Sequence, residues 1–453
     1  MLPILVQNVI TNFVSLLDNI MVGQVGTEPM SGVAIVNQLI FVFNLCIFGG
    51  LAGAGIFTAQ YYGKNDSKGV ADTFRAKLYI AAFTSAAFIV VFLLFGEQLI
   101  MQFIHEGEEQ LDMAATLNYG KDYLAVMLIQ IPPFALQQVY ASTLKESGET
   151  LVPMKAGIIA VLVNLVGNYI LIFGKLGAPV MGVVGAAIAT VISRFVECAI
   201  IIIWTHRHRD TNPFVDHAYT TWRIPETLLR QIVVMGLPLL VNELLWSSGM
   251  TVLSQCYSMR GLEVVSAVNI STTVSNLFFC AFFSMGNSIA IIIGQLLGAD
   301  RIEEAKDADR KLIFFAVSTT VVIAAILAAL SGAIPQIYEV SDGVRSLAAK
   351  LLLVAACTMP FDCLANACYF TIRSGGKTLV TMFFDSFYGL VFTTPLAYLL
   401  RLTTGIDIVW LYAVCRAVEL GKGVVGLILI KRGYWIHNIV KDQSNEHRVL
   451  PEA

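Results

Sequence analysis

The chain has 453 residues, of which 57% are hydrophobic and 13% are charged, and its mean hydropathy is +0.73. Soluble domains carry about 25% charged residues, so this composition indicates an integral membrane protein. The net charge of −3, without any polybasic domain, excludes a nucleic-acid-binding protein. The eight cysteines lie in or at the ends of apolar runs and form no CxxC pair, so we interpret them as reduced packing residues.

Apolar runs of about 20 residues recur along the chain and predict membrane-spanning helices. The strands of a membrane β-barrel would instead alternate over about 10 residues. We therefore predict an all-α integral membrane protein with twelve transmembrane helices. Their expected limits are 2–22, 32–60, 77–98, 121–143, 153–174, 182–204, 228–257, 264–297, 311–335, 346–371, 379–400 and 408–430. The first run lacks the charged leader of a signal peptide, so we expect it to be retained.

The sequence also repeats itself. Shifted by 235 residues without a gap, Leu2 to Gly63 pairs 14 identical residues over 62 positions with Leu237 to Gly298. Later elements repeat too, as TLKESGET against TIRSGGKT, and these glycine-rich elements predict helix ends. Six spans separate the copies, so both copies share one orientation. We predict two pseudo-symmetric six-helix lobes, a parallel repeat about an axis along the membrane normal.

The predicted domains are an N-lobe (1–205, helices 1–6), a cytoplasmic linker (206–230), a C-lobe (231–432, helices 7–12) and a cytoplasmic tail (433–453). Of the 29 Lys and Arg residues, 20 fall in the even-numbered connections and the tail. By the positive-inside rule both termini are cytoplasmic, in a multi-pass protein of the cytoplasmic (inner) membrane. We expect the polar linker to be the hinge between the lobes, and the protein to be a monomer surrounded by membrane lipid.

Ionisable residues inside the spans are the first candidates for function, because each costs about 2.5–3.5 kcal/mol at the centre of a membrane. They are Asp18, Arg194, Glu197, Glu243, Asp362, Asp385, Arg416, Glu419 and Lys422. Arg194 with Glu197, and Arg416 with Glu419, are spaced three apart, so each pair shares one face of a helix. Because this spacing recurs in both halves, we interpret the two pairs as structural ion pairs.

Asp18, Glu243 and Asp362 have no such neighbour in sequence and do not recur in the other copy. We predict that these three carboxylates couple an ion to transport. Pro360 lies just before Asp362 and frees a backbone carbonyl, and Glu243 and Asp362 together suit Na⁺ or a proton. The alternative is that they are polar contacts between helices. Substrate-cavity or supporting residues are predicted at Asn8, Gln138, Asn164, Asn168, Asn366 and Asp385.

The stretches DNIMVGQVG and FGKLGAPVMGVVGAAIAT, with the SGET and GGKT elements, resemble the multidrug and toxic compound extrusion (MATE) family of bacterial antiporters. The resemblance covers essentially the whole chain. It implies a twelve-helix exporter, not an enzyme and without a cofactor, that exchanges Na⁺ or H⁺ for a drug-like cationic or amphipathic compound.

The family's site residues transfer to this chain at some positions and not at others. Asp18 and Asp362 match the family's acids in the first and tenth helices. Glu243 is similar to its seventh-helix acid, although it lies nearer Pro238 than the family pattern. Asn168 stands where another branch carries the acid of an N-x-x-x-D pattern, which leaves the coupling role of this lobe to Asp18.

Three other classes of function are alternatives to the antiporter. A lipid-linked oligosaccharide flippase of the same superfamily would carry more than twelve spans and extra cationic residues in a central cavity. A channel or a purely structural membrane protein would not explain the unrepeated carboxylates. An ATP-driven pump would need a G-x-x-x-x-G-K-[ST] loop, of which Gly375-Gly376-Lys377-Thr378 has only the end.

Overall fold

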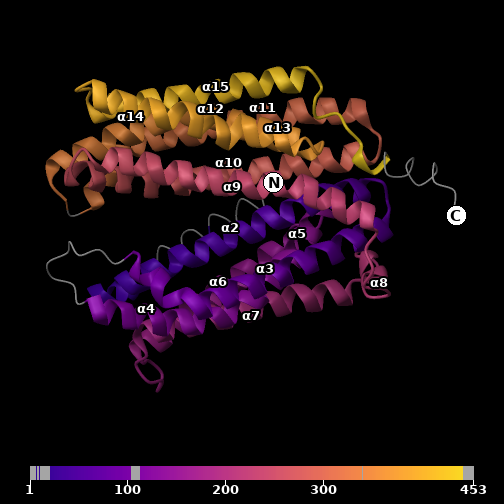
Figure 1. The fold of residues 1–453 in the computed structure, drawn as a ribbon, viewed down its shortest axis with the longest axis horizontal. Helices are drawn as coiled ribbons and strands as arrows, with labels where there is room; N and C mark the ends of the chain where they lie inside the picture. The colour runs from indigo at the N-terminus through magenta and orange to yellow at the C-terminus, as the bar shows by residue number, and fades with distance from the viewer. Residues whose placement is uncertain (1–6, 8–9, 11–20, 104–112, 339, 442–453) are drawn as a thin grey trace. The chain divides into compact units, whose positions relative to one another are not determined.

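The computed structural model describes residues 7, 10, 21–103, 113–338 and 340–441, and in these ranges the regular structure is entirely helical (Figure 1). Contacts between residues divide the chain into two compact units. The described residues of 2–58 and 67–229 form one unit, here called the N-unit. Those of 59–66 and 230–453 form the other, here called the C-unit. The helix α2 is therefore shared, since its last turn belongs to the C-unit.

The N-unit is built on long helices that pack side by side. Its elements are α2 (Thr27–Gly63, up to residue 58), α3 (Ser67–Met101), α4 (Met113–Met127), η1 (Leu128–Gln130), α5 (Ile131–Glu146), α6 (Leu151–Phe173), α7 (Gly182–Arg207) and α8 (Phe214–Ala218). The helices α6 and α7 pack along each other, and α3 packs against α5 and α8.

The region predicted as the polar linker between the lobes, 206–230, packs in part on the N-unit. In the short helix α8, Phe214, Val215 and Ala218 are buried. Arg75 of α3 donates to the backbone carbonyl of Arg223 at 2.5 Å and to that of His217 at 3.2 Å. These contacts tie most of the linker to one unit, because the carbonyls satisfy a guanidinium that is almost fully buried.

The C-unit has α12 at its centre, packed against α10, α11 and α15. Its elements are α9 (Glu226–Ser258, from residue 230), α10 (Leu262–Gly298), α11 (Ile302–Leu330), η2 (Ile334–Ile337), α12 (Asp342–Ser374), α13 (Thr378–Met382), η3 (Phe383–Phe387), η4 (Gly389–Thr393), α14 (Thr394–Thr403) and α15 (Ile408–Lys431). The elements α13 to α14 form one continuous helical span in which η3 and η4 are π-helical turns.

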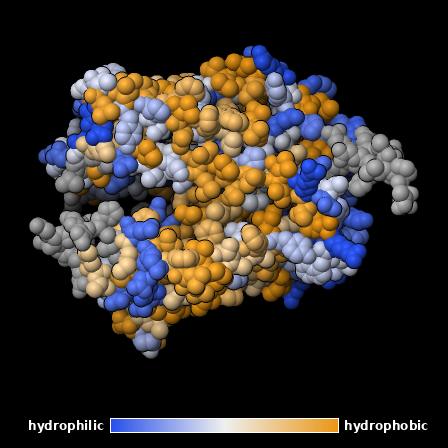
Figure 2. All heavy atoms as spheres, in the orientation of Figure 1, coloured by the Kyte–Doolittle hydropathy of each residue, from blue (hydrophilic) through white to orange (hydrophobic). Residues whose placement is uncertain are grey.

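Among the described residues, ten helical stretches are long and apolar enough to cross a membrane. The helix α15 corresponds to the twelfth predicted span, 408–430, and adds an eleventh long helix, which carries Arg416, Glu419 and Lys422. Most of the first predicted span, 2–22, lies outside the described residues. Figure 2 shows hydrophobic side chains over the middle of the helices and hydrophilic ones at their ends, as a membrane requires.

Helix ends follow the glycine signals of the sequence. The helix α5 ends at Glu146 and α12 ends at Ser374, and in each case a glycine with positive φ follows, Gly148 at +85° and Gly376 at +75°. Glycine adopts this conformation without steric cost. The observed helices extend beyond the predicted apolar limits, as α3 does from Ser67 instead of residue 77, because charged terminal turns remain helical outside the apolar layer. The cysteines are free, as predicted.

Candidate functional site

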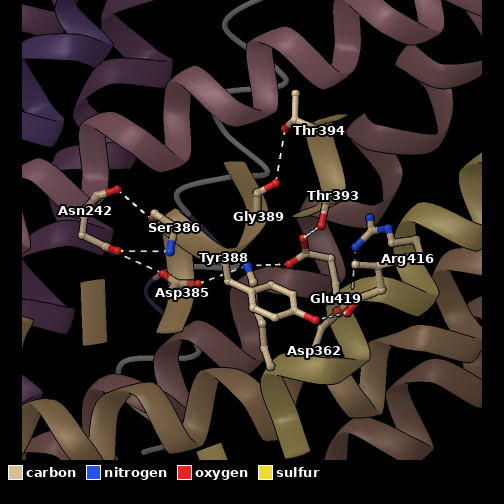
Figure 3. Close-up of polar contacts among 12 residues, drawn as sticks. Asn242, Asp362, Asp385, Ser386, Tyr388, Gly389, Thr393, Thr394, Arg416 and Glu419 are labelled. Atoms are coloured by element: carbon tan, nitrogen blue, oxygen red, sulfur yellow. Dashed lines mark hydrogen bonds and ion pairs between the residues drawn. The ribbon is translucent and has the colours of Figure 1, made fainter. Parts of the chain in front are cut away.

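A group of charged and polar side chains meets inside the C-unit, within the predicted membrane layer (Figure 3). We call it the C-unit network. It consists of Asn242 of α9, Asp362 of α12, Asp385 of η3, Thr393 of η4, and Arg416, Glu419 and Lys422 of α15. Five separate elements thus contribute to one cluster, and α12 and α15 place most of its charges.

Asp362 is paired with Arg416. Arg416 Nη1 lies 3.1 Å from Asp362 Oδ2, and the two side chains are 21% and 17% exposed. Arg416 also donates from Nη2 to the hydroxyl of Tyr412 at 3.0 Å. Its guanidinium carbon lies 5.4 Å from the centre of the Phe279 ring. Salt bridge, hydrogen bond and aromatic ring together hold this cation in a largely apolar surrounding.

This pairing corrects one prediction. Arg416 was expected to pair with Glu419, three residues away on the same helix, but it reaches Asp362 of another helix instead. Asp362 was expected to have no neighbour of opposite charge on its own helix, and its cation does come from another helix. The physical reason is that α12 packs directly on α15, so residues 54 positions apart in sequence come within salt-bridge distance.

Glu419 belongs to a second part of the network, centred on Lys422. Lys422 Nζ lies 2.5 Å from Glu419 Oε2 and 3.4 Å from Asp385 Oδ1, and its side chain is 11% exposed. Thr393 donates to the other Glu419 oxygen. Asn242 donates to Asp385 Oδ2 at 3.2 Å, and its backbone carbonyl accepts from Ser386 Oγ at 2.9 Å. Asp385 was predicted as a supporting residue, and it lies at the junction of these contacts.

The π-helical turns place Asp385 and Thr393 in the network. A π turn adds a residue to the helical turn and rotates the side chains that follow it. Pro395, in the first turn of α14, lacks the N–H group that an α-helix would use there. Thr394 Oγ1 instead donates to the carbonyl of Gly389, five residues earlier, at 3.3 Å.

The charges of the C-unit network do not balance. Asp362, Asp385 and Glu419 are three carboxylates, whereas Arg416 and Lys422 are two cations. The charge of Glu243 interacts with Arg373 and Asp385, which adds one carboxylate and one cation nearby. The described part of this site therefore holds one carboxylate more than it holds cations, and such a site attracts a cation or a proton.

Glu243 itself is partly buried in α9 and makes no hydrogen bond or ion pair with the other described residues. The adjacent residue, Asn242, is the one that enters the network. Asn366 lies against Phe370 and Gly286, and its side-chain oxygen is buried without a hydrogen-bond partner in the described chain.

The N-unit has a charged cluster of its own. Arg194 Nη1 lies 3.0 Å from Glu197 Oε2, as the spacing predicts, and Gln137 donates to the other Glu197 oxygen at 3.0 Å. Lys77 of α3 is fully buried and pairs with Glu146 of α5. Lys145 interacts with both carboxylates. In the described residues this cluster contains more cations than carboxylates, the reverse of the C-unit network.

The remaining predicted residues of the N-unit are only partly placed. Asn164 donates to Thr190 at 3.1 Å, and Asn168 donates to Asn164 at 3.4 Å, so these amides bridge α6 to α7. Gln138 is partly buried, and it is the adjacent Gln137 that contacts Glu197. Asp18 and Asn8 lie outside the described residues.

Sequence reasoning missed four buried charges of the described residues, Asp72, Arg75, Lys77 and Asp309. Two of them contact threonines that match between the repeats. One is Lys77, which was counted among the basic residues of a loop. The other is Asp309 of α11, which is 3% exposed and accepts a hydrogen bond of 2.6 Å from Thr371. Both lie near the polar end of a helix, and neither stood out from its charged neighbours in sequence. The matching Thr143 and Thr371 of the two repeats, which contact Lys77 and Asp309, were the available signal.

The predicted pairing of Glu243 with Asp362 around Na⁺ stays a prediction. Among the described residues, no three His, Cys, Asp or Glu side chains converge where a metal ion could be held.

Comparisons with known proteins agree with the geometry. The MatE family model matches residues 3–170 and again 238–399, so the two matches start at the offset of the internal repeat. A probable multidrug resistance protein NorM of Thermotoga maritima is 25% identical over 388 residues, which cover 84% of this chain and 80% of that protein. The multidrug resistance protein NorM of Vibrio vulnificus is 25% identical over 462 residues, which cover 100% and 96%.

Solved structures share the fold. An outward-facing multidrug resistance MATE family transporter of the MOP superfamily matches with a TM-score of 0.85 and 19% identity, over 95% of this chain and 94% of that one. A MOP superfamily transporter from Pyrococcus furiosus matches with a TM-score of 0.84 and 18% identity, over 96% and 94%. The fold of this chain is thus the twelve-helix integral membrane fold in two pseudo-symmetric lobes.

Proposed function

The chain belongs to the MatE family, the multidrug and toxic compound extrusion transporters, and we propose that it is a secondary antiporter. It exports organic cationic or amphipathic compounds across the cytoplasmic membrane in exchange for Na⁺ or H⁺. Both termini lie in the cytoplasm, as the distribution of basic residues predicts. The relatives named as multidrug resistance proteins support a small-molecule substrate.

The observation that carries the proposal is the surplus carboxylate of the C-unit network. Burying an uncompensated charge in a membrane protein is costly, so the site is more stable when a cation or proton is present. Arg416 already occupies one oxygen of Asp362. An arriving Na⁺ or proton therefore competes with Arg416, and its binding loosens the salt bridge between α12 and α15.

Loosening that salt bridge supplies a physical route for coupling. The network joins α9, α12, the π-helical turns and α15, so the charge state of one carboxylate affects how these elements pack. If ion and substrate favour different packings of the C-unit, each lowers the affinity for the other by the same factor. They need not share one pocket.

The test uses purified protein in lipid vesicles with Na⁺ and pH gradients imposed separately. Ethidium is a suitable fluorescent organic cation. We expect uphill export with one gradient for the natural chain, and its loss in Asp362→Asn. The matched control is Asp342→Asn, on the same helix α12, whose side chain is 97% exposed. It should transport normally, because exposed ion pairs contribute little.

Uphill export by Asp362→Asn with an unchanged ion dependence would overturn the role of Asp362. Absence of gradient-driven export in the natural chain, for a panel of organic cations, would overturn the antiporter itself. Transport of a lipid-linked oligosaccharide without either gradient would identify the flippase instead.

A further inference from the structure

The residues that follow α15 form an ordered part of the C-unit. Gly433–Lys441, here called the C-terminal strap, turns back from the end of α15 across the ends of other helices (Figure 1). Trp435, Ile439 and Val440 are 2%, 3% and 1% exposed. Trp435 packs in a buried cluster with Ile289 and other residues of α10, α11 and α12. This region was predicted as a tail, and Trp435, Ile439 and Val440 within it are buried.

Gln60, in the last turn of α2, holds the strap. Its side chain is fully buried. The amide nitrogen donates to the carbonyl of Ser374 at 3.0 Å and to that of His437 at 3.2 Å, and the amide oxygen accepts from Ile439 N at 2.9 Å. A glutamine is the residue that satisfies both carbonyls and the N–H group at once, because it carries two donors beside its acceptor.

The strap also fits closely against the end of α12. A side chain at Gly375 would overlap the backbone carbonyl of Trp435, and one at Gly376 would meet Ile439. At its far end, Lys441 Nζ lies 2.7 Å from Asp300 Oδ2, in the turn between α10 and α11. The strap therefore contacts the ends of α2, α10 and α12 together.

The ends of α2 and α10 touch through their backbones. A side chain at Gly63 would overlap the carbonyl of Gln295, and one at Gly298 would overlap the carbonyl of Gln60. Gly63 and Gly298 are partners in the internal repeat, as are Gln60 and Gln295. Each copy of the repeat therefore supplies one glycine and one carbonyl to this crossing of α2 and α10. The strap adds hydrogen bonds on the Gln60 side of this crossing, where it binds the amide.

We propose that the C-terminal strap is a latch, which fastens the last turn of α2 to the ends of α10 and α12 and must release when this turn moves in the transport cycle. The body of α2, up to Thr58, belongs to the N-unit and its last turn to the C-unit, so the latch opposes movement of this last turn away from α10 and α12. It lies beside the basic connections predicted to be cytoplasmic. The proposal rests on the proposed antiport function, in which the two sides open alternately.

The first test follows hydrogen–deuterium exchange of residues 433–441 in purified protein, which needs no transport. Gln60→Leu keeps the size of the side chain but removes its hydrogen bonds, and we expect exchange there to accelerate about tenfold or more. The matched control is Gln336→Leu, at an exposed position of the C-unit, which should exchange as the natural chain does. In the natural chain, adding Na⁺ at constant pH should alter the exchange of the strap.

The second test locks the latch. Cys46, Cys280 and Cys357, which are not buried, are replaced by Ala, and Gln60→Cys is combined with His437→Cys. A short, reducible thiol cross-linker should lower gradient-driven ethidium export at least tenfold, and reduction should restore it. The single variant Gln60→Cys, treated alike, is the control and should keep its rate.

Normal export by fully cross-linked protein would overturn the latch, and so would strap exchange that is unaffected by Gln60→Leu or by ions. Absence of export before cross-linking would count against the antiport function instead. The exchange experiment would then decide the latch alone.

Discussion

At the residue scale, the sequence located the right turns of helix but not always the right residue. Glu243 was the candidate of the seventh span, yet its neighbour Asn242 enters the C-unit network. Gln138 was the candidate of the fourth span, yet Gln137 contacts Glu197. Successive residues point about 100° apart around a helix. Only the packing of neighbouring helices decides which of two adjacent polar residues faces inward.

Asn242 should therefore matter for stability. In Asn242→Leu the carboxylate of Asp385 and the N–H of Ser386 lose a partner. Leaving such buried groups unsatisfied costs about 1–3 kcal/mol. We expect a lower midpoint of thermal unfolding in detergent, measured by tryptophan fluorescence. Leu244→Ala, at an exposed position of the same helix, is the control, and equal midpoints for the natural chain and Asn242→Leu would contradict the assignment.

The Asp362–Arg416 pair gives a second prediction. Arg416→Met leaves Asp362 buried without its cation, and breaking a buried pair costs about 3–5 kcal/mol, or less where water reaches it. The double variant Asp362→Leu with Arg416→Met removes both charges and should recover most of the stability. Both variants should lose ion-driven export, because the coupling carboxylate is unpaired in one and absent in the other.

Folded yield and thermal midpoint report the loss of stability, which separates it from the loss of ion-driven export. If the double variant is as unstable as Arg416→Met, the salt bridge is not the source of the loss. If the double variant exports with the ion dependence of the natural chain, the pair is structural, and coupling must lie elsewhere.

At the scale of elements, the π-helical turns are the feature that places charges. Asp385 and Thr393 reach Lys422 and Glu419 because η3 and η4 replace regular α-helix in this span. Functional sites often use such turns. The network therefore lies where this span departs from regular α-helix.

Pro395→Ala tests this role. The new N–H group allows a regular hydrogen bond and favours α-helix through η4, so Thr393 should turn away from Glu419. We expect the thermal midpoint to be kept or raised, because proline disfavours a helix interior, while gradient-driven export falls. Pro335→Ala, in η2 outside this span, is the control. Unchanged export in Pro395→Ala would show that the π register is not needed.

The ion pair between Lys441 of the strap and Asp300 gives a prediction about pH. Lys441, the last residue of the strap, donates a hydrogen bond to Asp300 and carries a positive charge. Both effects hold the pKa of the Asp300 carboxyl below its ordinary value of 3.8. A lowered pKa stabilises the folded arrangement above the ordinary pKa, and the contribution disappears only as pH falls through the lowered value. Between pH 5 and 8 this ion pair should therefore not change the strap.

Intrinsic exchange rates are pH-dependent, so the measurement compares the natural chain with Asp300→Asn at each pH. The ratio of their protection factors for residues 438–441 should stay constant from pH 5 to 8. A ratio that changes within that window would assign the titration to another group.

At the scale of the whole molecule, the two units are expected to move against each other as ions and substrate exchange. Leu176 of the N-unit and Ile337 of the C-unit are 89% and 79% exposed, so spin labels there should not disturb packing. Both lie in connections predicted to face the outside. We expect two populations of label distance, whose ratio shifts with Na⁺ or pH.

The control is the same labelled pair in Asp362→Asn, where the ratio should no longer respond to the ion. Pulsed electron paramagnetic resonance in lipid nanodiscs measures both. A single distance that is the same with and without ions would contradict alternating access by movement of these units.

The sequence by itself determined the membrane class, the helices, the internal repeat and the helix that holds each charge. Hydrophobic runs, loop charges and helix-ending glycines are local signals, and a membrane makes them strong because it leaves few alternatives to a helix. The TLKESGET and TIRSGGKT elements even located the two left-handed glycines that follow α5 and α12.

The tertiary structure decided which charges pair and what the end of the chain does. Arg416 and Asp362 are 54 residues apart, Lys422 and Asp385 are 37 apart, and Gln60 and Ile439 are 379 apart. Such pairs depend on which helices pack together and on which face each presents. Spacing along one helix favoured Arg416 with Glu419, but α12 brought a better-placed carboxylate to Arg416, and a salt bridge forms where the geometry is best.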